Sequence, residues 1–178
     1  MLEGDRVVLR PIQERDRERL YELVETIEVR ALSTHDPPLP LSLEEIEARD
    51  RRWLEERPTD SAWFAIDVDA ETIGMCGLHS IDHFQQRAEI GIRLGKVYWG
   101  KGYGQDAVRT LLDYGFRHLN LARIALRVLA DDERAVGAYR KAGFVEEGRL
   151  RAHAWYEGAR HDELVMSVLR EEWQPPAS

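Results

Sequence analysis

Short apolar runs that alternate with polar residues recur along the chain, and turn-forming residues separate them. Such alternation is typical of β-strands that bury one face. In the run 87–94, for example, Ile90, Ile92 and Leu94 alternate with small or charged residues. On this pattern we expect strands at residues 6–11, 62–68, 72–80, 87–94 and 124–129, and two more that are joined by a turn at Glu157-Gly158.

Between these runs the spacing of apolar residues changes to the helical period. Leu20, Leu23, Val24 and Ile27 recur at i, i+3, i+4 and i+7, which predicts one amphipathic helix. The prolines at positions 37, 38 and 40 predict that this helix breaks and gives way to a loop.

A second helix is expected directly after that loop. Ser42-Leu43-Glu44-Glu45 fits a capping box, in which the side chains of Ser42 and Glu45 each accept a hydrogen bond from the other's backbone amide. The helix would then run through Ile46, Trp53 and Leu54 and end before Pro58.

Two further helices are expected in the second half of the chain. Val108, Leu111, Leu112 and Phe116 share one helical face, and residues 133–142 form another helix. Strands, then helices, then strands indicate a single α/β domain with a mixed sheet rather than a doubly wound one. We place this domain at residues 1–174 and expect residues 175–178 to form a flexible tail.

Composition places this domain among globular proteins. The chain has 178 residues, of which 43% are hydrophobic and 33% are charged, so it can bury a core without disulfides. No apolar run approaches the ~18 residues of a membrane span, and the first six residues carry no signal-peptide core. The single cysteine, Cys76, excludes an internal disulfide and fits the reducing cytoplasm.

The charge is negative overall but unevenly distributed. Its formal value of −8 argues against general nucleic-acid binding. Residues 1–60 hold ten basic and sixteen acidic side chains, whereas residues 87–127 hold eight basic and three acidic ones, a local net charge of +5. Two interpretations stay open, namely solvated helix faces with a chance excess further on, or a middle segment that receives an anionic ligand.

The most specific chemical signal is the run Gly100-Lys101-Gly102-Tyr103-Gly104, which lies between a strand and a helix. Glycines let the backbone turn tightly and approach a ligand, and the free amides at a helix start bind phosphate oxygens. A P-loop is excluded because Gly102 stands where a magnesium-binding Ser or Thr is needed, and a dinucleotide fingerprint would need a glycine at Gln105. A pyrophosphate turn for coenzyme A remains, beside the simpler interpretation of a helix start with incidental glycines.

A second informative segment spans residues 131–144 and forms a short helix after a strand. Asp132 is placed to cap its start, and Gly143 stands at its end. Ala135, Ala138, Tyr139 and Ala142 share one face of this helix.

Together these segments resemble the GNAT N-acetyltransferase superfamily, in its RimJ/RimL-like branch. The resemblance rests on the opening strand 6–11, the turn 98–104, the motif 139–144 and a final hairpin that ends in Trp173. It implies an α/β fold with a mixed, mostly antiparallel central sheet flanked by helices. The fourth and fifth strands, 87–94 and 124–129, would splay apart so that acyl-CoA enters between them.

The resemblance also implies which residues hold acetyl-CoA, the acyl donor. Backbone groups of Ile92 and Leu94 would contact the pantetheine arm, and an amide near Ile92 would stabilise the oxyanion. The pyrophosphate would be held by the amides of the turn, which are those of Gly100, Lys101, Gly102, Tyr103 and Gly104. Asp132, where the family often has an asparagine, would lie beside the cofactor and keep the capping role.

Amine acylation needs an uncharged nucleophile and a protonated leaving thiolate. An amine with a pKa near ~10 is mostly ammonium at neutral pH, so a base or a water chain must take a proton from it. By the resemblance, Tyr139 would give a proton to the thiolate and Glu89 would receive one from the acceptor. The competing roles are a core aromatic for Tyr139 and a solvent-facing carboxylate for Glu89.

Other chemistry-bearing residues are assigned structural roles. His79 and His83 lie at a strand end and in a loop, so the helical i, i+4 geometry of a metal site does not arise, and no metal is expected. Trp53, Trp63, Trp155 and Trp173 are expected to pack in the core.

Three functions are weighed, namely an N-acetyltransferase, a catalytically silent acyl-CoA-binding regulatory module, and a nucleotide-dependent kinase that Gly102 disfavours. The acceptor would be a primary amine, either a protein or peptide N-terminus, a polyamine or another small amine. Stretches 81–92 and 113–163 resemble bacterial spermidine acetyltransferases, although Asp36 is the one carboxylate in 31–41, where polyamine enzymes usually carry an acidic pair. Neither nucleic acid nor membrane is expected as a partner, and a homodimer is left open.

Overall fold

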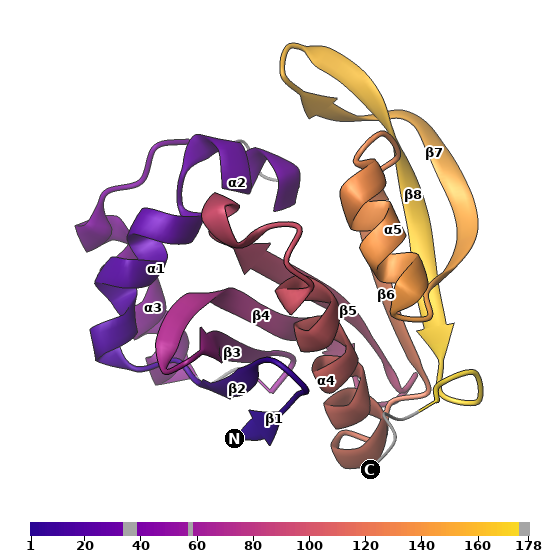
Figure 1. Ribbon diagram of the computed structural model, residues 1–178, viewed down its shortest axis with the longest axis horizontal. Helices are drawn as coiled ribbons and strands as arrows, with labels where there is room; N and C mark the ends of the chain where they lie inside the picture. The colour runs from indigo at the N-terminus through magenta and orange to yellow at the C-terminus, as the bar shows by residue number, and fades with distance from the viewer. Residues whose placement is uncertain (34–38, 57–58, 175–178) are drawn as a thin grey trace.

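An eight-stranded sheet forms the centre of the protein in a computed structural model, which describes residues 1–33, 39–56 and 59–174 (Figure 1). The strands are β1 (Leu2–Glu3), β2 (Val8–Pro11), β3 (Ala62–Val68), β4 (Glu71–Asp82), β5 (Arg87–Leu94), β6 (Arg123–Leu129), β7 (Val145–Tyr156) and β8 (Ala159–Leu169). The helices are α1 (Arg17–Val24), α2 (Ile27–Ser33), α3 (Leu43–Glu56), α4 (Tyr103–His118) and α5 (Glu133–Lys141), with short 3-10 turns η1 (Glu14–Asp16) and η2 (Lys96–Tyr98).

Some expectations fall outside the described residues. These are the prolines at 37, 38 and 58, the side chains of Trp53 and Leu54, and the tail 175–178.

The strand order is β1-β2-β3-β4-β5-β6-β8-β7. Within the described chain β5 and β6 run parallel, and every other neighbouring pair is antiparallel. The prediction of a mixed, mostly antiparallel sheet is therefore confirmed. The short edge strand β1, which pairs with β2, was not indicated by the alternation of residues.

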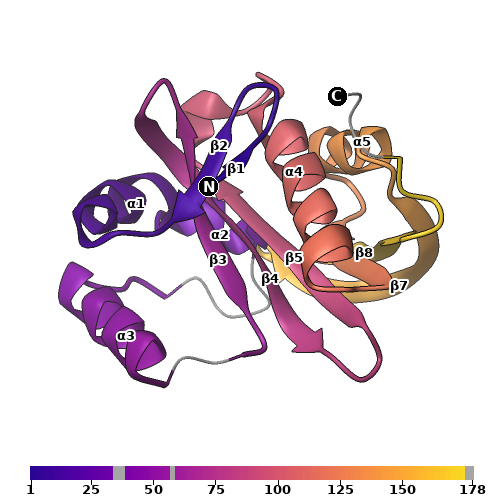
Figure 2. The same cartoon turned by 90° about the horizontal axis from the view of Figure 1, so that it is seen from below.

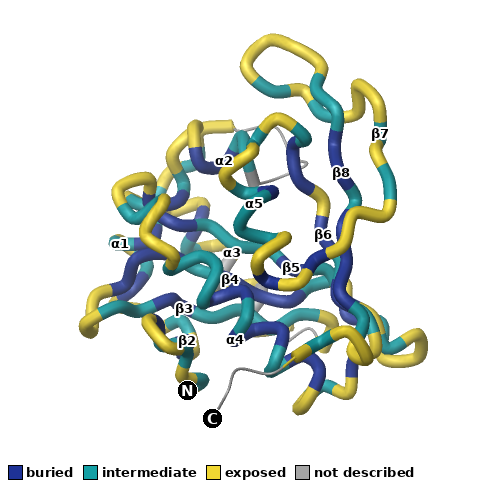
Figure 3. Tube along the Cα trace, turned by 45° about the vertical axis from the view of Figure 1, so that its right-hand side comes forward, coloured by how far each residue is buried: buried dark blue, intermediate teal, exposed yellow. Residues whose placement is uncertain are grey.

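Helices cover both faces of this sheet (Figure 2). The helices α4 and α5 pack on one face, where Leu78, Leu111 and Ile124 belong to the larger core. The helices α1 and α2 pack on the other face around a smaller core of Leu20, Val24 and Val29. Buried positions follow the middle of the sheet through β4, β5, β6 and β8, whereas β7 at the edge is largely exposed (Figure 3).

The two central strands separate at one end. Pairing between β5 and β6 joins residues 87–89 to residues 123–125, and no further pairing joins the two strands in the described ranges. Residues 90–94 and 126–129 therefore diverge and leave a V-shaped opening, as the resemblance implied. Because the two strands do not pair with each other there, their facing edges can offer backbone groups to a ligand.

The first predicted helix is in fact two. The helix α1 ends at Val24, and α2 begins at Ile27, whose side chain is exposed rather than part of the apolar stripe. The Thr26 hydroxyl accepts a hydrogen bond from the Val29 amide at 3.3 Å, so Thr26 acts as a cap that starts a new helix. The break thus precedes the prolines that were expected to cause it.

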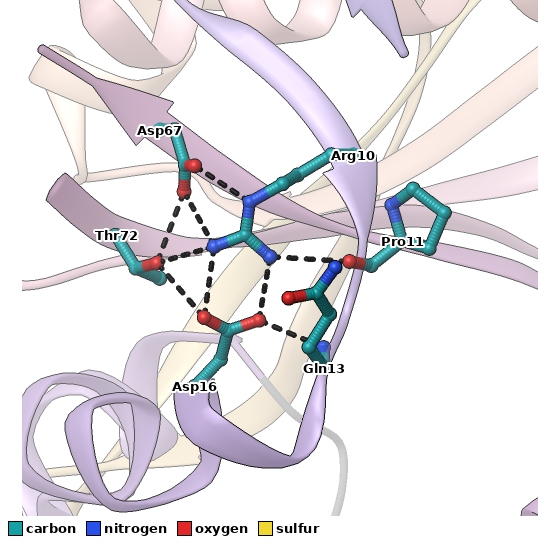
Figure 4. A network of polar contacts seen from close by, with 6 residues as sticks. All are labelled: Arg10, Pro11, Gln13, Asp16, Asp67 and Thr72. Carbon is teal, nitrogen blue, oxygen red and sulfur yellow. Dashed lines mark hydrogen bonds and ion pairs between the residues drawn. The ribbon is translucent and has the colours of Figure 1, made fainter. Parts of the chain in front are cut away.

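A buried ionic cluster ties the opening strand to the sheet (Figure 4). The Arg10 guanidinium donates hydrogen bonds to the carboxylates of Asp16 and Asp67 at 2.6 Å each, and to the Thr72 hydroxyl at 2.9 Å. The Gln13 amide donates to the same Asp16 carboxylate at 2.7 Å. This cluster joins β2, β3, β4 and the entrance to α1, and so fixes the order in which they pack.

Candidate functional site

The V-shaped opening leads into a cavity of about 550 Å³. Residues of α2, β5, β6, α5 and both strands of the final hairpin line it, and Figure 1 shows α2 and this hairpin on either side of the same end of the molecule. Five residues that the sequence singled out meet on its wall. They are Ile92, Leu94, Gly104, Asp132 and Tyr139.

The glycine-rich turn adopts a backbone that other residues disfavour. Gly100 has φ +72° and Gly102 has φ +85°, both in the left-handed region, and Gly102 caps the start of α4. A Cβ on Gly104 would lie 3.2 Å from Leu94 Cδ1, so a side chain there would crowd β5. The first hydrogen bond of α4 runs from the Asp106 amide to the Gly102 carbonyl, which leaves the earlier amides of the turn without an intrahelical partner. This geometry suits an anionic ligand.

The N-terminal residues hold this turn from behind. Arg6 Nη1 donates a hydrogen bond to the Lys101 carbonyl at 2.5 Å, and its guanidinium lies 5.0 Å from the centre of the Tyr103 ring. The Asp106 carboxylate accepts hydrogen bonds from the backbone amides of Asp5, Arg6 and Val7. The conformation of the turn is therefore fixed by segments far away in sequence.

The remaining turn residues lie outside the cavity lining. Gly104 and Gln105 belong to the described lining, whereas Gly100, Lys101, Gly102 and Tyr103 do not. Trp99 donates a hydrogen bond from Nε1 to the Leu94 carbonyl at 2.8 Å. Arg134 of α5 lies over its ring at 4.3 Å, so Trp99 links the end of β5 to α5.

Tyr139 lies on α5 and faces the cavity. The N-cap of this helix is Asp132, as predicted, because its Oδ1 accepts a hydrogen bond from the Ala135 amide at 2.9 Å. Burial, and then the charge of Asp132, raises the pKa of Tyr139 to about 12. The hydroxyl is thus protonated at neutral pH and has no hydrogen-bond acceptor among the described residues, so it is free to donate to a ligand.

Glu89 lies at the paired end of β5, opposite His79 on β4 and beside Ala125 on β6. It alternates with Ile90 and so shares the face of Arg93, which pairs with Glu25 at the end of α1. Glu89 is not among the described residues that line the cavity. A proton passing from the cavity to Glu89 would therefore need a water path.

Sequence reasoning missed the part of the wall that the hairpin supplies. His153 and Trp155 of β7 and Arg160 and Glu163 of β8 all line the cavity. The expectation that Trp155 packs in the core is wrong, since its side chain is 64% exposed and lies under the Arg160 guanidinium. The turn at Glu157-Gly158 was visible in the sequence, but which side chains the hairpin would aim inward was not.

The described residues contain neither a candidate metal site nor a helix that could span a membrane. No group of three or more His, Cys, Asp or Glu side chains in the described ranges could hold a metal ion. In those same ranges, no helix has the length and apolar character needed to cross a bilayer.

Comparison with known proteins agrees with this geometry. Residues 6–145 match the profile of the acetyltransferase (GNAT) domain. The chain is 35% identical over 106 residues to the putative ribosomal N-acetyltransferase YdaF of Bacillus subtilis (strain 168), a match covering 60% of this chain and 58% of that protein. It is 34% identical over 110 residues to the spermidine N(1)-acetyltransferase of Escherichia coli (strain K12), a match covering 62% of this chain and 59% of that protein.

The chain therefore spans less than two thirds of the length of these two curated relatives. Its fold covers more of a solved structure. It matches the spermidine N-acetyltransferase from Vibrio cholerae, crystallised with CoA and spermine, with a TM-score of 0.86 and 25% identity over 95% of this chain and 98% of that one. Because the domain profile matches residues 6–145, which are most of the chain, this protein belongs to the GNAT acetyltransferase family.

Proposed function

We propose that the protein is an acetyl-CoA-dependent N-acetyltransferase, which moves an acetyl group to a primary amine by direct attack in a ternary complex. One observation carries this proposal. The unpaired edge of β5, the glycine-capped start of α4 and the protonated Tyr139 all border the same cavity. The acyl donor supplies an activated thioester. The protein itself would bind and orient the acyl donor and the amine, and it would move protons to and from them.

Binding would involve β5 and the start of α4. The unpaired edge of β5 near Ile92 and Leu94 offers backbone groups to the pantetheine amides and an amide to the developing oxyanion. The amides from Gly100 to Gly104 would hold the pyrophosphate, supported by the positive φ angles of Gly100 and Gly102. Asp132, at the start of α5, would form part of the wall of the site.

Tyr139 is the proposed donor to the leaving thiolate. Its pKa of about 12 lies above the ~8.5 of an ordinary thiol, so the hydroxyl would first act as a hydrogen-bond donor to the charge developing on sulfur. Proton transfer would follow as the C–S bond breaks.

Glu89 is the carboxylate that the sequence suggests as the proton acceptor. Its place at the paired end of β5, outside the described cavity lining, supports a role through water rather than direct contact.

The proposed acceptor class is a primary amine of a small molecule or of a protein N-terminus. Relatives named for spermidine and for ribosomal proteins support this range. A cytoplasmic location, which the lone buried Cys76 supports, belongs to the same proposal.

Release of CoA thiol during incubation with acetyl-CoA and an amine panel tests the proposal. The panel should contain polyamines, aminoglycosides and peptides with free N-termini, each paired with its N-acetylated form as a control. We expect at least one free amine to accelerate thiol release while its acetylated form does not. Binding of acetyl-CoA without release by any amine would favour a silent regulatory module instead.

A further inference from the structure

A histidine–carboxylate pair on the final hairpin lines the same cavity as Tyr139. Nδ1 of His153 on β7 lies 2.6 Å from Oε2 of Glu163 on β8. The Glu163 side chain is 8% exposed and the His153 side chain 46% exposed. The carboxylate is thus fixed within the wall while the imidazole reaches the solvent of the cavity.

An irregularity in β7 creates this pair. Leu150 pairs with Glu163 and Ala154 pairs with His161, so residues 151–153 stand opposite Asp162 alone. Ala152 at the centre of this bulge has φ +51°, a backbone that a non-glycine residue rarely adopts. Bulges near active sites commonly redirect a side chain, and this one directs His153 to Glu163.

Asp162 holds the bulge in place. Its carboxylate accepts hydrogen bonds from the Ala152 amide at 2.8 Å and from Arg149 Nη1 at 3.1 Å. The Ala152 amide, and then Arg149, lowers the pKa of Asp162, so the carboxylate is ionised in its holding role. A strained residue with a dedicated partner indicates that the geometry at His153 is specified rather than incidental.

The partner of Nδ1 determines what the other nitrogen can do. An ionised carboxylate accepts hydrogen bonds, so the Nδ1–H tautomer of His153 satisfies the 2.6 Å contact. Nε2 then carries a lone pair, and no described residue hydrogen-bonds to it. Because His153 and Tyr139 line the same cavity, this lone pair can accept a proton at the site where Tyr139 can donate one.

A second pair on the same hairpin provides an internal comparison. His161 Nδ1 lies 2.6 Å from Asp131 Oδ2, but its Nε2 is engaged by the Tyr156 carbonyl at 3.1 Å. His161 is not among the described residues that line the cavity. His161 therefore also has a carboxylate partner at Nδ1, but its Nε2 is occupied and it lies outside the described cavity lining.

We propose that His153, held by Glu163, is the direct proton acceptor for the incoming ammonium group. This inference rests on the proposed function. Nε2 takes one proton from R–NH3+, and the freed lone pair forms the C–N bond at the thioester carbonyl carbon. When the C–S bond breaks, its electron pair stays on sulfur, which receives a proton from Tyr139, and the nitrogen's second proton restores Tyr139. The products are one acetylated amine and one CoA thiol. The proton taken up by His153 is then released to solvent.

Several charged groups line the cavity together with His153. Among the described residues they are Glu163 and Arg160 on β8, Arg93 on β5, Arg127 on β6, and Asp132 and Arg134 on α5. Arg160 Nη1 also donates to the His153 carbonyl at 3.4 Å.

The test compares His153→Gln, Glu163→Gln and the control His161→Gln by kcat/KM against pH, using an amine accepted by the wild-type protein. We expect the wild type to lose kcat/KM at acidic pH, because a protonated imidazole cannot accept a proton. His153→Gln should lose ~10²-fold at neutral pH and lack this acidic limb. Glu163→Gln should also lower kcat/KM, because the carboxylate that fixes the Nδ1–H tautomer is lost. His161→Gln should stay within ~3-fold of wild type, and added imidazole should partly rescue His153→Ala.

A folded His153→Gln variant with the wild-type pH profile and kcat/KM within ~3-fold would overturn the proposal. Nitrogen-15 NMR of His153 gives a readout that does not need turnover. The Nδ1–H tautomer is the expected result, and the Nε2–H tautomer would overturn the proposal. A wild-type protein that releases no thiol with any amine would instead count against the proposed function, and NMR would then decide this inference separately.

Discussion

The surroundings of Tyr139 raise its pKa above that of an ordinary tyrosine. Burial comes first and the Asp132 carboxylate second, and together they raise its pKa to about 12. The same carboxylate caps α5 through the Ala135 amide, so the residue that starts the helix also tunes the residue that faces the site. A phenol in this state can donate at any pH at which the protein would be assayed.

Replacing Tyr139 with Phe should therefore lower kcat by ~10²-fold, a typical share for general-acid catalysis, while leaving the fold intact. The change removes one hydroxyl and keeps the edge-on contact with Phe144 at 5.7 Å between ring centres. Steady-state thiol release and an unfolding curve measure both effects. In the wild type, Tyr139 should add no alkaline limb below its pKa of about 12. A folded variant with unchanged turnover, under conditions where chemistry limits the rate, would reduce Tyr139 to a packing residue.

Glu89 and His153 can be separated by their pH dependence. If Glu89 removes the proton, Glu89→Gln should lower kcat/KM most below the pKa of the amine and less above it, where the amine is already neutral. Measurement at about pH 6 and about pH 9.5 tests this, with salt varied to remove any effect of long-range charge. An equal loss at both pH values would assign Glu89 a structural or positioning role and leave the proton to His153.

Asp16 should contribute a pH-dependent part of the stability. The Arg10 guanidinium lowers the pKa of Asp16 below its ordinary value, and both side chains are less than 10% exposed. For a lowered folded-state pKa, the stabilisation is present above the unfolded value of ~3.9 and is lost as the pH falls towards the folded value. Asp16→Asn should cost about 3 kcal/mol near pH 7, because it removes the charge that balances buried Arg10, and the difference from wild type should shrink below ~pH 4.

Denaturant unfolding at pH 7 and pH 3 measures this effect. Glu14→Gln is the matched control, since Glu14 lies in the same 3-10 turn with a side chain that is 91% exposed. It should change the free energy of unfolding by less than ~0.5 kcal/mol. A pH-independent difference for Asp16→Asn would contradict the assigned role of its charge.

Local motifs made some of these residues predictable from the sequence. Each of Tyr139, Asp132 and Gly102 lies in a short sequence motif, and the spacing of residues in that motif indicated a functional role. His153 and Glu163 could not be found in this way, because the pairing depends on a bulge between two strands. The partners of Arg10 were equally hidden, since Asp67 and Thr72 come from strands far along the chain.

At the level of elements, the turn before α4 is shaped by its glycines and by the N-terminal segment together. A Cβ at Gly102 would lie 2.8 Å from Arg6 Nη1, the atom that holds the Lys101 carbonyl. The left-handed φ of Gly102 adds strain for any other residue. The turn is thus sensitive at a position that lies outside the cavity lining.

Gly102→Val should weaken acetyl-CoA binding by at least ~10-fold, since strain of ~1–3 kcal/mol would be relieved by moving the turn. Calorimetric titration with acetyl-CoA measures the change. Gly137→Ala is the control, because a Cβ there meets open space in the middle of α5. The control should keep the affinity and gain up to ~1 kcal/mol in stability. Wild-type affinity in a folded Gly102→Val protein would reject the turn as the pyrophosphate site.

The elements were predictable to the extent that each follows from its own residues. The capping box of α3 is present, with the Ser42 amide 2.7 Å from Glu45 Oε2, and the hairpin turn falls at Glu157-Gly158. The division between α1 and α2 was not foreseen, because the stripe through Ile27 continues the helical spacing. A capping threonine and a buried Glu25, which pairs with Arg30, Arg49 and Arg93, override that spacing.

The whole molecule is organised around the separation of β5 and β6. Alternation within each strand does not show where that strand stops pairing with its neighbour, so only the family resemblance predicted the separation. In the fold, α4 and α5 pack on one face of the open strands, while α2 and the β7–β8 hairpin close the cavity from the other side.

A crystal structure of the protein with CoA tests this arrangement most directly. The account predicts density for CoA between β5 and β6, with the pyrophosphate at the amides of residues 100–104 and the sulfur within hydrogen-bonding distance of the Tyr139 hydroxyl. CoA bound elsewhere on the protein, or a sulfur beyond the reach of Tyr139, would contradict it.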